Sequence, residues 1–201
     1  MRVLIACEHT GAVRNAFIRA GHEAMSCDLL DTEAPGPHYM GDVRDVLGGS
    51  WDLMVAHPPC TYLSVSGLHW NSRVPGRSQK TEEGLNFVRL LMFCDIPRIA
   101  IENPVSCIST RIRKPDQVIQ PWQFGHPESK ATCLWLKALP RLVPTKDVYQ
   151  HMMTLPLKER MRCHYASPGP DRWKLRSATY AGIAEAMANQ WGSPAQMEIA
   201  A

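Results

Sequence analysis

The chain has 201 residues, 45% of them hydrophobic and 20% charged, which fits one soluble globular domain and leaves little room for a second. The formal net charge of +3 permits an anionic partner without requiring one. The opening segment MRVLIACEHTG holds only a short apolar run, so neither a signal peptide nor a membrane span is expected, and the predicted location is the cytoplasm. Seven cysteines without CxxC spacing indicate reduced, mostly buried thiols.

The first part of the chain alternates strand-like and helix-like patterns. Residues 2–7, RVLIAC, form a β-branched apolar run that predicts a strand, and residues 10–21 place apolar side chains at helical spacing. Residues 22–30, HEAMSCDLL, predict a second short strand that ends in an acid. After a loop rich in proline and glycine, WDLMVAH at residues 51–57 predicts a third strand.

The alternation continues to the end of the chain. Residues 81–94 predict an amphipathic helix, and residues 97–104, PRIAIENP, predict a fourth strand. Residues 131–139, ATCLWLKAL, fit a fifth strand, although their length and composition also allow a helix. Residues 178–192 predict a helix that ends at Gly192. Strands that alternate with helices predict an α/β protein with a mostly parallel, doubly wound sheet.

One segment interrupts this order. Residues 138–176 contain several prolines and clustered basic residues without periodicity, which predicts an irregular segment inside a single domain spanning residues 1–201. The basic stretches RIRK at 111–114 and KERMRCH at 158–164 are expected to be solvated loops, and they are the best candidates for phosphate contacts.

Residues able to do chemistry fall where the predicted strands end, which is where ligands bind in such sheets. A turn at Gly11 after the first strand would bring backbone amides and a helix N-terminus to a ligand. Asp28 ends the second strand, where an acid can bind ribose hydroxyls, and Asp42 follows in GDVRD. Cys60 follows two prolines after the third strand, and Glu102 ends the fourth. Taken singly, each acid fits an ordinary loop residue, and a thiol on a stiff turn is oriented without being reactive.

Together these segments resemble the DNA cytosine-5 methyltransferases, most strongly around the cysteine that follows the third strand. That family carries Pro-Cys-Gln-x-Phe-Ser-x-x-Gly after a strand, where this chain has PCTYLSVSG. The positions shared at identical spacing are Pro59, Cys60, Ser64 and Gly67. The family's Glu-Asn-Val is similar to ENP, at Glu102 and Asn103.

Other segments follow the family's order along the chain. CEHTGAVRNAF resembles the loop Phe-x-Gly-x-Gly-Gly, and AGHEAMSCD and GDVRD stand where the family has its ribose-binding acid and its adenine-binding Gly-Asp. FGHPESKAT is similar to Tyr-Gly-x-Pro-Gln-x-Arg-x-Arg, and TYAGIAEAMA lies where a glycine-containing helix returns to the cofactor pocket. The resemblance covers roughly residues 2–135 and 176–192, in an arrangement like that of short phage-encoded members, whose location would be the host cytoplasm.

The resemblance implies a Rossmann-like S-adenosylmethionine-dependent methyltransferase fold, S-adenosylmethionine as cofactor, and duplex or single-stranded DNA as substrate. The catalytic residues it implies are Cys60, Glu102 and Lys130. The cofactor-binding residues it implies are Cys7, Glu8, His9, Thr10, Gly11, Asp28, Asp42, Val43, Pro58 and Gly182. The substrate-binding residues it implies are Pro59, Ser64, Asn103 and Thr132.

The chemistry explains why these residue types are needed. Carbon 5 of cytosine is not nucleophilic enough to attack a sulfonium until a thiolate has added to carbon 6, and Cys60 would supply that thiolate. Glu102 would hold the exocyclic amine and protonate or hydrogen-bond N3. The methyl group then moves to carbon 5, a base removes the carbon-5 proton, and Cys60 leaves.

The chain departs from the family at several of these positions. Glu8 and His9 stand where the family's small residues approach the methionine part of the cofactor, which implies a reshaped pocket or a modified methyl donor. Thr61 replaces the glutamine beside the nucleophile. Lys130 and Thr132 replace two arginines, one of which contacts the cytosine carbonyl oxygen in the family; lysine keeps the charge but loses the planar fork.

Only residues 138–176 stand where the family places a much larger target-recognition domain, so sequence reading in a duplex groove is expected to be curtailed. Three hypotheses remain: a cytosine-5 methyltransferase of DNA, a relative acting on single-stranded nucleic acid, RNA or a mononucleotide, and a noncatalytic nucleic-acid-binding relative. Retention of both the cysteine and the glutamate argues against the third. No metal is expected, because His151, Cys163 and His164 lack a fourth ligand at suitable spacing. The target sequence and the oligomeric state are not predicted.

Overall fold

The computed structural model describes residues 1–169 and 172–193. These residues form a seven-stranded sheet in the order β3-β2-β1-β4-β5-β7-β6, in which β7 runs antiparallel to both neighbours and the other adjacent pairs are parallel. The strands are β1 (Arg2–Ala6), β2 (Glu23–Asp28), β3 (His38–Met40), β4 (Leu53–Ala56), β5 (Arg98–Pro104), β6 (Gln117–Ile119) and β7 (Thr132–Lys137).

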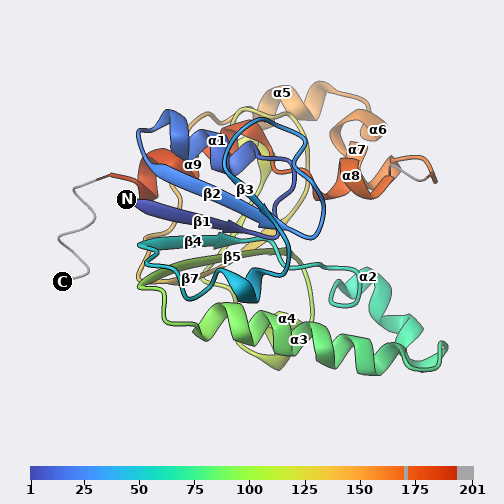
Figure 1. Ribbon diagram of the computed structural model, residues 1–201. Coiled ribbons are helices and arrows are strands. Elements are labelled where there is room, and N and C mark those ends of the chain that lie inside the picture. Colours follow the sequence, from blue (N-terminus) through green and yellow to red (C-terminus); the bar gives the residue numbers. More distant parts are fainter. Residues whose placement is uncertain (170–171, 194–201) are drawn as a thin grey trace.

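The sheet is buried on both faces, as β1 illustrates. Val3 and Ile5 of this strand point into one hydrophobic core and Leu4 and Ala6 into another, because successive side chains of a strand alternate between faces. The helices over the two cores are α1 (Ala12–Arg19), α3 (Arg77–Phe93), α4 (Ile108–Arg111) and α9 (Ala181–Trp191). Helices α1 and α9 cover the first face, and α3 and α4 cover the second (Figure 1). The predicted mostly parallel, doubly wound α/β fold is therefore confirmed.

Parallel pairing brings the carboxyl ends of β1, β2, β4 and β5 to one edge of the sheet, called the carboxyl edge below. Ala6 lies opposite both Cys27 and Ala56, and Ala56 lies opposite Ile101. Four short helices stand beyond this edge: α2 (Val65–Leu68), α6 (Leu157–Arg160), α7 (Arg162–Tyr165) and α8 (Arg172–Ser177). In Figure 1, α2 projects past the edge on the α3 side, and α6 to α8 lie on the opposite side.

The structure differs from the sequence prediction at several points. The ambiguous residues 131–139 form strand β7, and α3 begins before the predicted residue 81. The short strands β3 and β6 were not predicted. The segment 138–176 is less irregular than expected, since α5 (Tyr149–Thr154), α6, α7 and most of α8 lie in it.

The 3-10 helices are η1 (Val43–Asp45), η2 (His69–Ser72) and η3 (Pro121–Gln123). None of the helices within residues 1–169 and 172–193 has the length and apolar character to cross a membrane.

Candidate active site

Cys60 lies on a tight turn just beyond β4, at the carboxyl edge. Its carbonyl oxygen accepts hydrogen bonds from the amides of Leu63 and Ser64, at 3.0 and 2.9 Å. The side-chain amide of Asn103, at the end of β5, donates to the carbonyl oxygen of Pro58 at 2.8 Å. Cys60 is exposed, whereas Asn103 is buried. Asn103, predicted to bind substrate, thus fixes the turn that carries Cys60.

Glu102 reaches the same edge from β5 and pairs with His57. His57 Nδ1 lies 3.2 Å from Glu102 Oε2, and the two side chains are only 12% and 18% exposed. They meet because Ala56 lies opposite Ile101, so the next residue of each strand comes side by side. Burial alone would raise the pKa of Glu102, but the hydrogen bond and charge of His57 lower it overall.

Lys130 and Thr132 approach Glu102 from the start of β7. The charge of Lys130 and the hydroxyl of Thr132 both add to the lowering of the Glu102 pKa. The Lys130 ammonium donates to the carbonyl oxygen of Ala178 at 3.3 Å and lies 5.6 Å from the centre of the Tyr180 ring, a cation–π contact. Lys130 is thereby held between Glu102 and the segment that leads into α9.

The thiol of Cys60 is coupled electrostatically to these groups. The surrounding protein desolvates the thiol, and together with the charge of Glu102 this raises the pKa of Cys60; Arg176 and Lys130 oppose the rise without cancelling it. The resting thiol is therefore protonated near neutral pH. Cys60, Glu102 and Lys130, predicted from separate segments, lie within electrostatic reach of one another.

The turn after β1 is built differently from a glycine-rich cofactor loop. Cys7 has a φ of 59°, in the left-handed region, and the chain then brings Glu8 back over the start of α1. Glu8 Oε1 accepts the Val13 amide at 2.7 Å, and Oε2 accepts the Arg14 amide at 3.2 Å. Gly11 has a φ of 71°, and a Cβ there would meet the Arg14 guanidinium. Two amides that were expected to face a ligand are bonded to Glu8.

A loop of residues 32–36 folds over this turn and is held by Arg14. The fully buried Arg14 guanidinium donates to two carbonyl oxygens of the loop, at 2.7 and 3.0 Å. The Glu33 amide donates to the carbonyl oxygen of His9 at 2.8 Å. The buried His9 ring lies 5.4 Å from the Trp173 ring of α8, measured between centroids. His9 is thus tied into the protein on two sides.

The acids predicted to bind ribose and adenine lie at the ends of β2 and β3. Asp28 Oδ1 accepts the Leu30 amide at 3.0 Å, and Oδ2 has no hydrogen-bond partner in the part of the chain that the structure describes. Asp42 caps η1, and hydrogen bonds from the amide and guanidinium of Arg44 lower its pKa. Val43 is buried in the core on the α3 face. Among these three predicted cofactor residues, Asp28 keeps a carboxylate oxygen open to a ligand.

Three further predicted residues lie close to these turns. The Thr10 hydroxyl accepts the Ala12 amide at 3.4 Å, and the hydroxyls of Ser64 and Ser66 lie 3.1 Å apart. Pro59 is exposed directly beside the thiol-bearing residue. Pro59 is therefore better placed to touch a substrate than the two hydroxyls, which have partners within their own turns.

Gly182 and Pro58, both predicted to bind the cofactor, are packed into the protein. The Gly182 amide donates to His126 Nε2 at 3.0 Å, and a Cβ at this position would overlap the carbonyl oxygen of Phe124. Pro58 is buried under the turn that leads to the thiol. The structure gives both residues packing roles.

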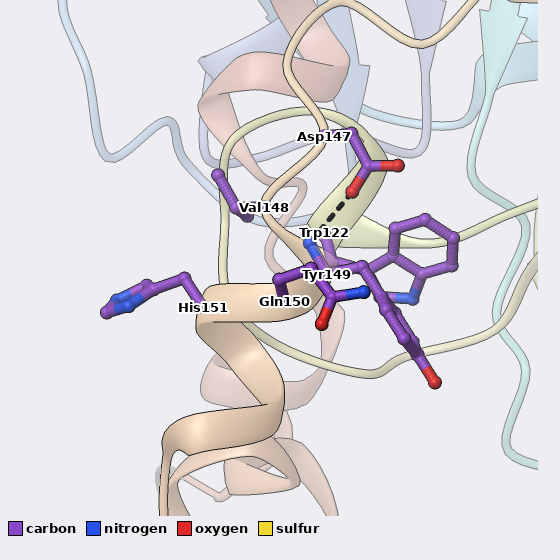
Figure 2. Close-up of a pocket in the computed structure, with 6 residues that line it drawn as sticks. All are labelled: Trp122, Asp147, Val148, Tyr149, Gln150 and His151. Atoms are coloured by element: carbon purple, nitrogen blue, oxygen red, sulfur yellow. Dashed lines mark hydrogen bonds between the residues drawn. The ribbon is translucent and has the colours of Figure 1, made fainter.

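The larger of two notable cavities, about 520 Å³, lies outside this site. It is lined by Trp122, Asp147, Val148, Tyr149, Gln150 and His151. Figure 2 shows the Trp122 and Tyr149 rings side by side, with centroids 5.0 Å apart, while the His151 side chain points away from them. The Asp147 carboxylate accepts the Tyr149 amide at 2.8 Å. This cavity contains none of the residues predicted from the sequence.

The smaller cavity, about 430 Å³, adjoins the catalytic candidates. Ala178 and Tyr180 line it, and both contact Lys130. Inside it, Glu128 accepts hydrogen bonds from the Arg162 guanidinium and the Tyr180 hydroxyl, each at 2.8 Å. Its wall also includes Lys158, Tyr165 and Ser167. Cationic, aromatic and hydroxyl groups therefore surround a space beside Lys130.

The two basic stretches proposed for phosphate contacts differ in their surroundings. In RIRK, Arg111 pairs with Glu82 at 2.8 Å and Arg113 pairs with Asp116 at 2.7 Å, so both guanidinium groups are engaged within the protein. Residues 158–164 form most of α6 and α7, beside the smaller cavity; Arg162 is likewise paired, with Glu128 at 2.8 Å, but Lys158 lies on the cavity wall. The second stretch is the better placed of the two for phosphate contacts, because it borders a cavity.

Three polar residues of this region were not selected from the sequence: His57, Arg176 and the buried Arg14. His57 carried a usable signal, because it and Glu102 each follow buried apolar residues of adjacent strands. Arg176 and Arg14 carried none, since their positions depend on how α8 and the 32–36 loop fold back on the carboxyl edge.

No protein-family model and no curated protein sequence matches the chain. It is similar to a solved structure from E. coli, described as a "putative DNA modification methyltransferase encoded within prophage Cp". The two share 15% sequence identity with a TM-score of 0.46, over 78% of this chain and 56% of the other. The chain spans little more than half the length of that protein, whose activity does not transfer to it on such a likeness.

Proposed function

We propose that the chain transfers a methyl group from S-adenosylmethionine to carbon 5 of cytosine in DNA, through a covalent adduct at Cys60. The observation that carries the proposal is the meeting of Cys60, Glu102 and Lys130 at the carboxyl edge, where Glu102 and Lys130 act in opposite directions on the pKa of Cys60, and Lys130 also lowers that of Glu102. A thiol, a carboxylate and an ammonium are the groups needed to attack carbon 6, contact N3 and balance charge on the ring.

Cys60 attacks as a thiolate, so its thiol must lose a proton once the base is in place. Lys130 and Arg176 favour the thiolate electrostatically, in opposition to desolvation of the thiol by the surrounding protein and to the charge of Glu102. Sγ then forms a bond to carbon 6, and the displaced electron pair moves through carbon 5 and carbon 4 to N3. Carbon 5 becomes the nucleophilic end of an enamine.

Glu102 and Lys130 stabilise the ring as electrons reach N3. Glu102 binds the exocyclic amine and N3, while Lys130 supplies positive charge near the base. Because Lys130 also donates to Ala178 and lies over Tyr180, its ammonium is held at one place instead of moving freely. Thr132 supports the Glu102 carboxylate from β7.

The cofactor fits this edge best at its nucleoside end. Asp28 keeps an oxygen for ribose hydroxyls, and the exposed side chains of Leu29 and Met40 lie beside it as apolar surface for a purine ring. At the methionine end, the buried carboxylate of Glu8 accepts two amides of α1, so the turn at Cys7 leaves neither of these amides free to bind the cofactor. When bound there, S-adenosylmethionine supplies an electrophilic methyl group.

The cationic groups around the smaller cavity support a nucleic-acid substrate. Lys158 and Arg162 lie on its wall with the rings of Tyr165 and Tyr180, a combination suited to phosphates and unpaired bases. The short segment that supplies most of these residues leaves few groups to read a duplex groove. Single-stranded DNA, RNA or a mononucleotide is therefore the second candidate, because an unpaired base needs no flipping.

Incubation with labelled S-adenosylmethionine and duplex DNA, single-stranded DNA, transfer RNA or dCMP tests the proposal. We expect label at carbon 5 of cytosine, with unpaired cytosine used at least as well as paired cytosine, because unstacking costs a few kcal/mol. Activity on DNA should fall steeply as salt increases. Label on none of the four substrates would contradict the proposal, and a sharp consensus confined to duplex DNA would contradict the limited role of residues 138–176.

Asp28→Ala is expected to weaken binding of S-adenosylhomocysteine by roughly 10- to 100-fold, since it removes the carboxylate that would accept hydrogen bonds from the ribose hydroxyls. Titration calorimetry measures the change. Asp31→Ala, at an exposed acid three residues further on, should leave the affinity nearly unchanged. Equal weakening in both variants would show that general charge, and not ribose recognition, is responsible.

A further inference from the structure

The His57–Glu102 pair is the most enclosed acid–base contact at the carboxyl edge. Nδ1 and Oε2 lie 3.2 Å apart, on side chains that are both largely buried. The pair is fixed by the backbone: the His57 amide donates to the Ala6 carbonyl oxygen at 2.9 Å, and Asn103 holds the next residue of the turn. His57 therefore has little freedom to leave Glu102.

The charged groups that face His57 come from three other elements. Glu102 comes from β5, Glu8 from the turn after β1, and Lys130 from the segment before β7. The two carboxylates favour the protonated ring and Lys130 opposes it. His57 Nε2 is buried and has no hydrogen-bond partner within residues 1–169 and 172–193. The contact to Glu102 is thus the side-chain hydrogen bond that controls the protonation of the His57 ring.

These contacts keep one proton on the pair. Burial favours neutral His57, but the hydrogen bond and charge of Glu102 prevail and raise the pKa of His57, while the pKa of Glu102 is lowered. Because its pKa is raised on folding, protonated His57 stabilises the fold at low pH, and this contribution is lost as the pH rises through the pKa of the folded state. The pKa of Glu102 is lowered on folding, so its contribution is present at higher pH and is lost as the pH falls through the pKa of the folded state. The pair therefore stabilises the fold most between about pH 4.5 and 6.5, the ordinary pKa values of the two groups.

On the basis of the proposed cytosine-5 chemistry, we propose that His57 is a positioning residue that fixes the Glu102 carboxylate and stores the proton that Glu102 delivers to N3. A carboxylate alone carries no proton to give. The imidazolium beside it supplies one when the basicity of N3 rises.

The proton balance of the pair closes over one turnover, and the Cys60 thiol proton passes to solvent before attack and is regained from solvent when the thiolate leaves carbon 6. As the Cys60 thiolate bonds to carbon 6, N3 gains a proton from Glu102, and Nδ1 of His57 gives its proton to Glu102, which leaves a neutral imidazole. When the carbon-5 proton departs to a base and the bond between Sγ and carbon 6 breaks, N3 loses its proton. That proton returns through Glu102 to His57, and the pair is restored.

Nuclear magnetic resonance of histidine-labelled protein tests the stored proton without cofactor or substrate. The His57 signal, assigned by its loss in His57→Gln, should titrate above the ordinary value of about 6.5 in the wild type. In Glu102→Gln, where burial is opposed only by the smaller effect of Glu8, the pKa of His57 should fall below its wild-type value. A His57 that titrates at or below the ordinary value in the wild type would overturn the proposal.

Release of tritium from [5-³H]deoxycytidine in DNA tests delivery of the proton without the cofactor, because the enamine can exchange its carbon-5 hydrogen with water. His57→Gln keeps a donor for Glu102 but cannot ionise. It should lower the rate about 100-fold at pH 6.5, where the raised pKa of His57 keeps the wild-type ring protonated and an ordinary carboxyl group is ionised, and by less than about 3-fold at pH 4.5, where solvent protonates Glu102. The change should lie in kcat, with KM nearly constant.

His22→Gln is the matched control, at a histidine that precedes β2 on the opposite edge of the sheet, and should show no such pH-dependent loss. A wild-type to His57→Gln ratio that is constant with pH would reduce His57 to a packing role and overturn the proposal. Absence of both tritium release and methyl transfer in the wild type would refute the proposed function, and with it the delivery to N3. The resonance titration would then still decide whether the pair holds a proton.

Discussion

Replacing Cys60 with serine is expected to abolish methyl transfer, by roughly 10⁴-fold or more, because a hydroxyl cannot supply the nucleophile that attack on carbon 6 requires. The fold should be unaffected, since the residue is exposed and the replacement is of similar size. Cofactor affinity should also stay close to that of the wild type. Transfer of labelled methyl groups, thermal unfolding and calorimetry measure the three quantities.

Cys94→Ser provides the comparison. Cys94 is a partly buried free cysteine just after α3, and its Sγ contacts the carbonyl oxygen of Leu91 at 3.3 Å, a contact that a hydroxyl can replace. This variant should retain full activity. Transfer at the wild-type rate by the Cys60 variant would exclude the covalent route, whereas equal loss in both variants would point to a general effect of thiol removal.

Gly182→Ala is expected to lower the free energy of unfolding by about 3 kcal/mol, at the upper end of the cost of overpacking a core. The added Cβ would occupy the position of the Phe124 carbonyl oxygen, which belongs to the backbone and cannot rotate away. Helix α9 would have to move from its place over the α1 face of the sheet. Urea unfolding of the protein without ligands measures the effect.

Gly48→Ala is the matched control, because a Cβ at Gly48 would meet no atom within 4 Å. It should change the free energy of unfolding by no more than about 0.5 kcal/mol. A Gly182→Ala protein as stable as the wild type, but unable to bind S-adenosylhomocysteine, would return Gly182 to the cofactor pocket expected from the sequence.

The central strands could be predicted because burial on both faces leaves a continuous apolar run, as in β1 and β4. Strands β3 and β6 have only three residues each and are partly exposed, so they carry no such run. Strand β7 remained ambiguous in the sequence because TCLWLK suits a helix as well as a strand. Pairing with β5 on one side and β6 on the other decides it, and that pairing is a tertiary effect.

The site was less predictable than the sheet. Placement at strand ends and a family-like spacing selected Cys60, Glu102 and Lys130, and their functional roles remain predictions. His57 belongs to the same edge but matches no position of the motif; its place after an apolar run could have marked it as a strand-end residue, and the strand register then identifies its partner. Glu8 was assigned to the cofactor from its position, yet its two carboxylate oxygens accept amides of α1. A side chain that folds back on its own helix cannot be recognised from spacing alone.

The protonated state of Cys60 also bears on the chemical durability of the protein. An exposed cysteine is open to peroxides and electrophiles, and its rate of damage follows the fraction present as thiolate. Desolvation and the negative charge of Glu102 keep that fraction small while the site awaits a substrate. The electrostatic effects that keep Cys60 protonated until a cytosine base is bound therefore also protect the thiol from oxidation before binding.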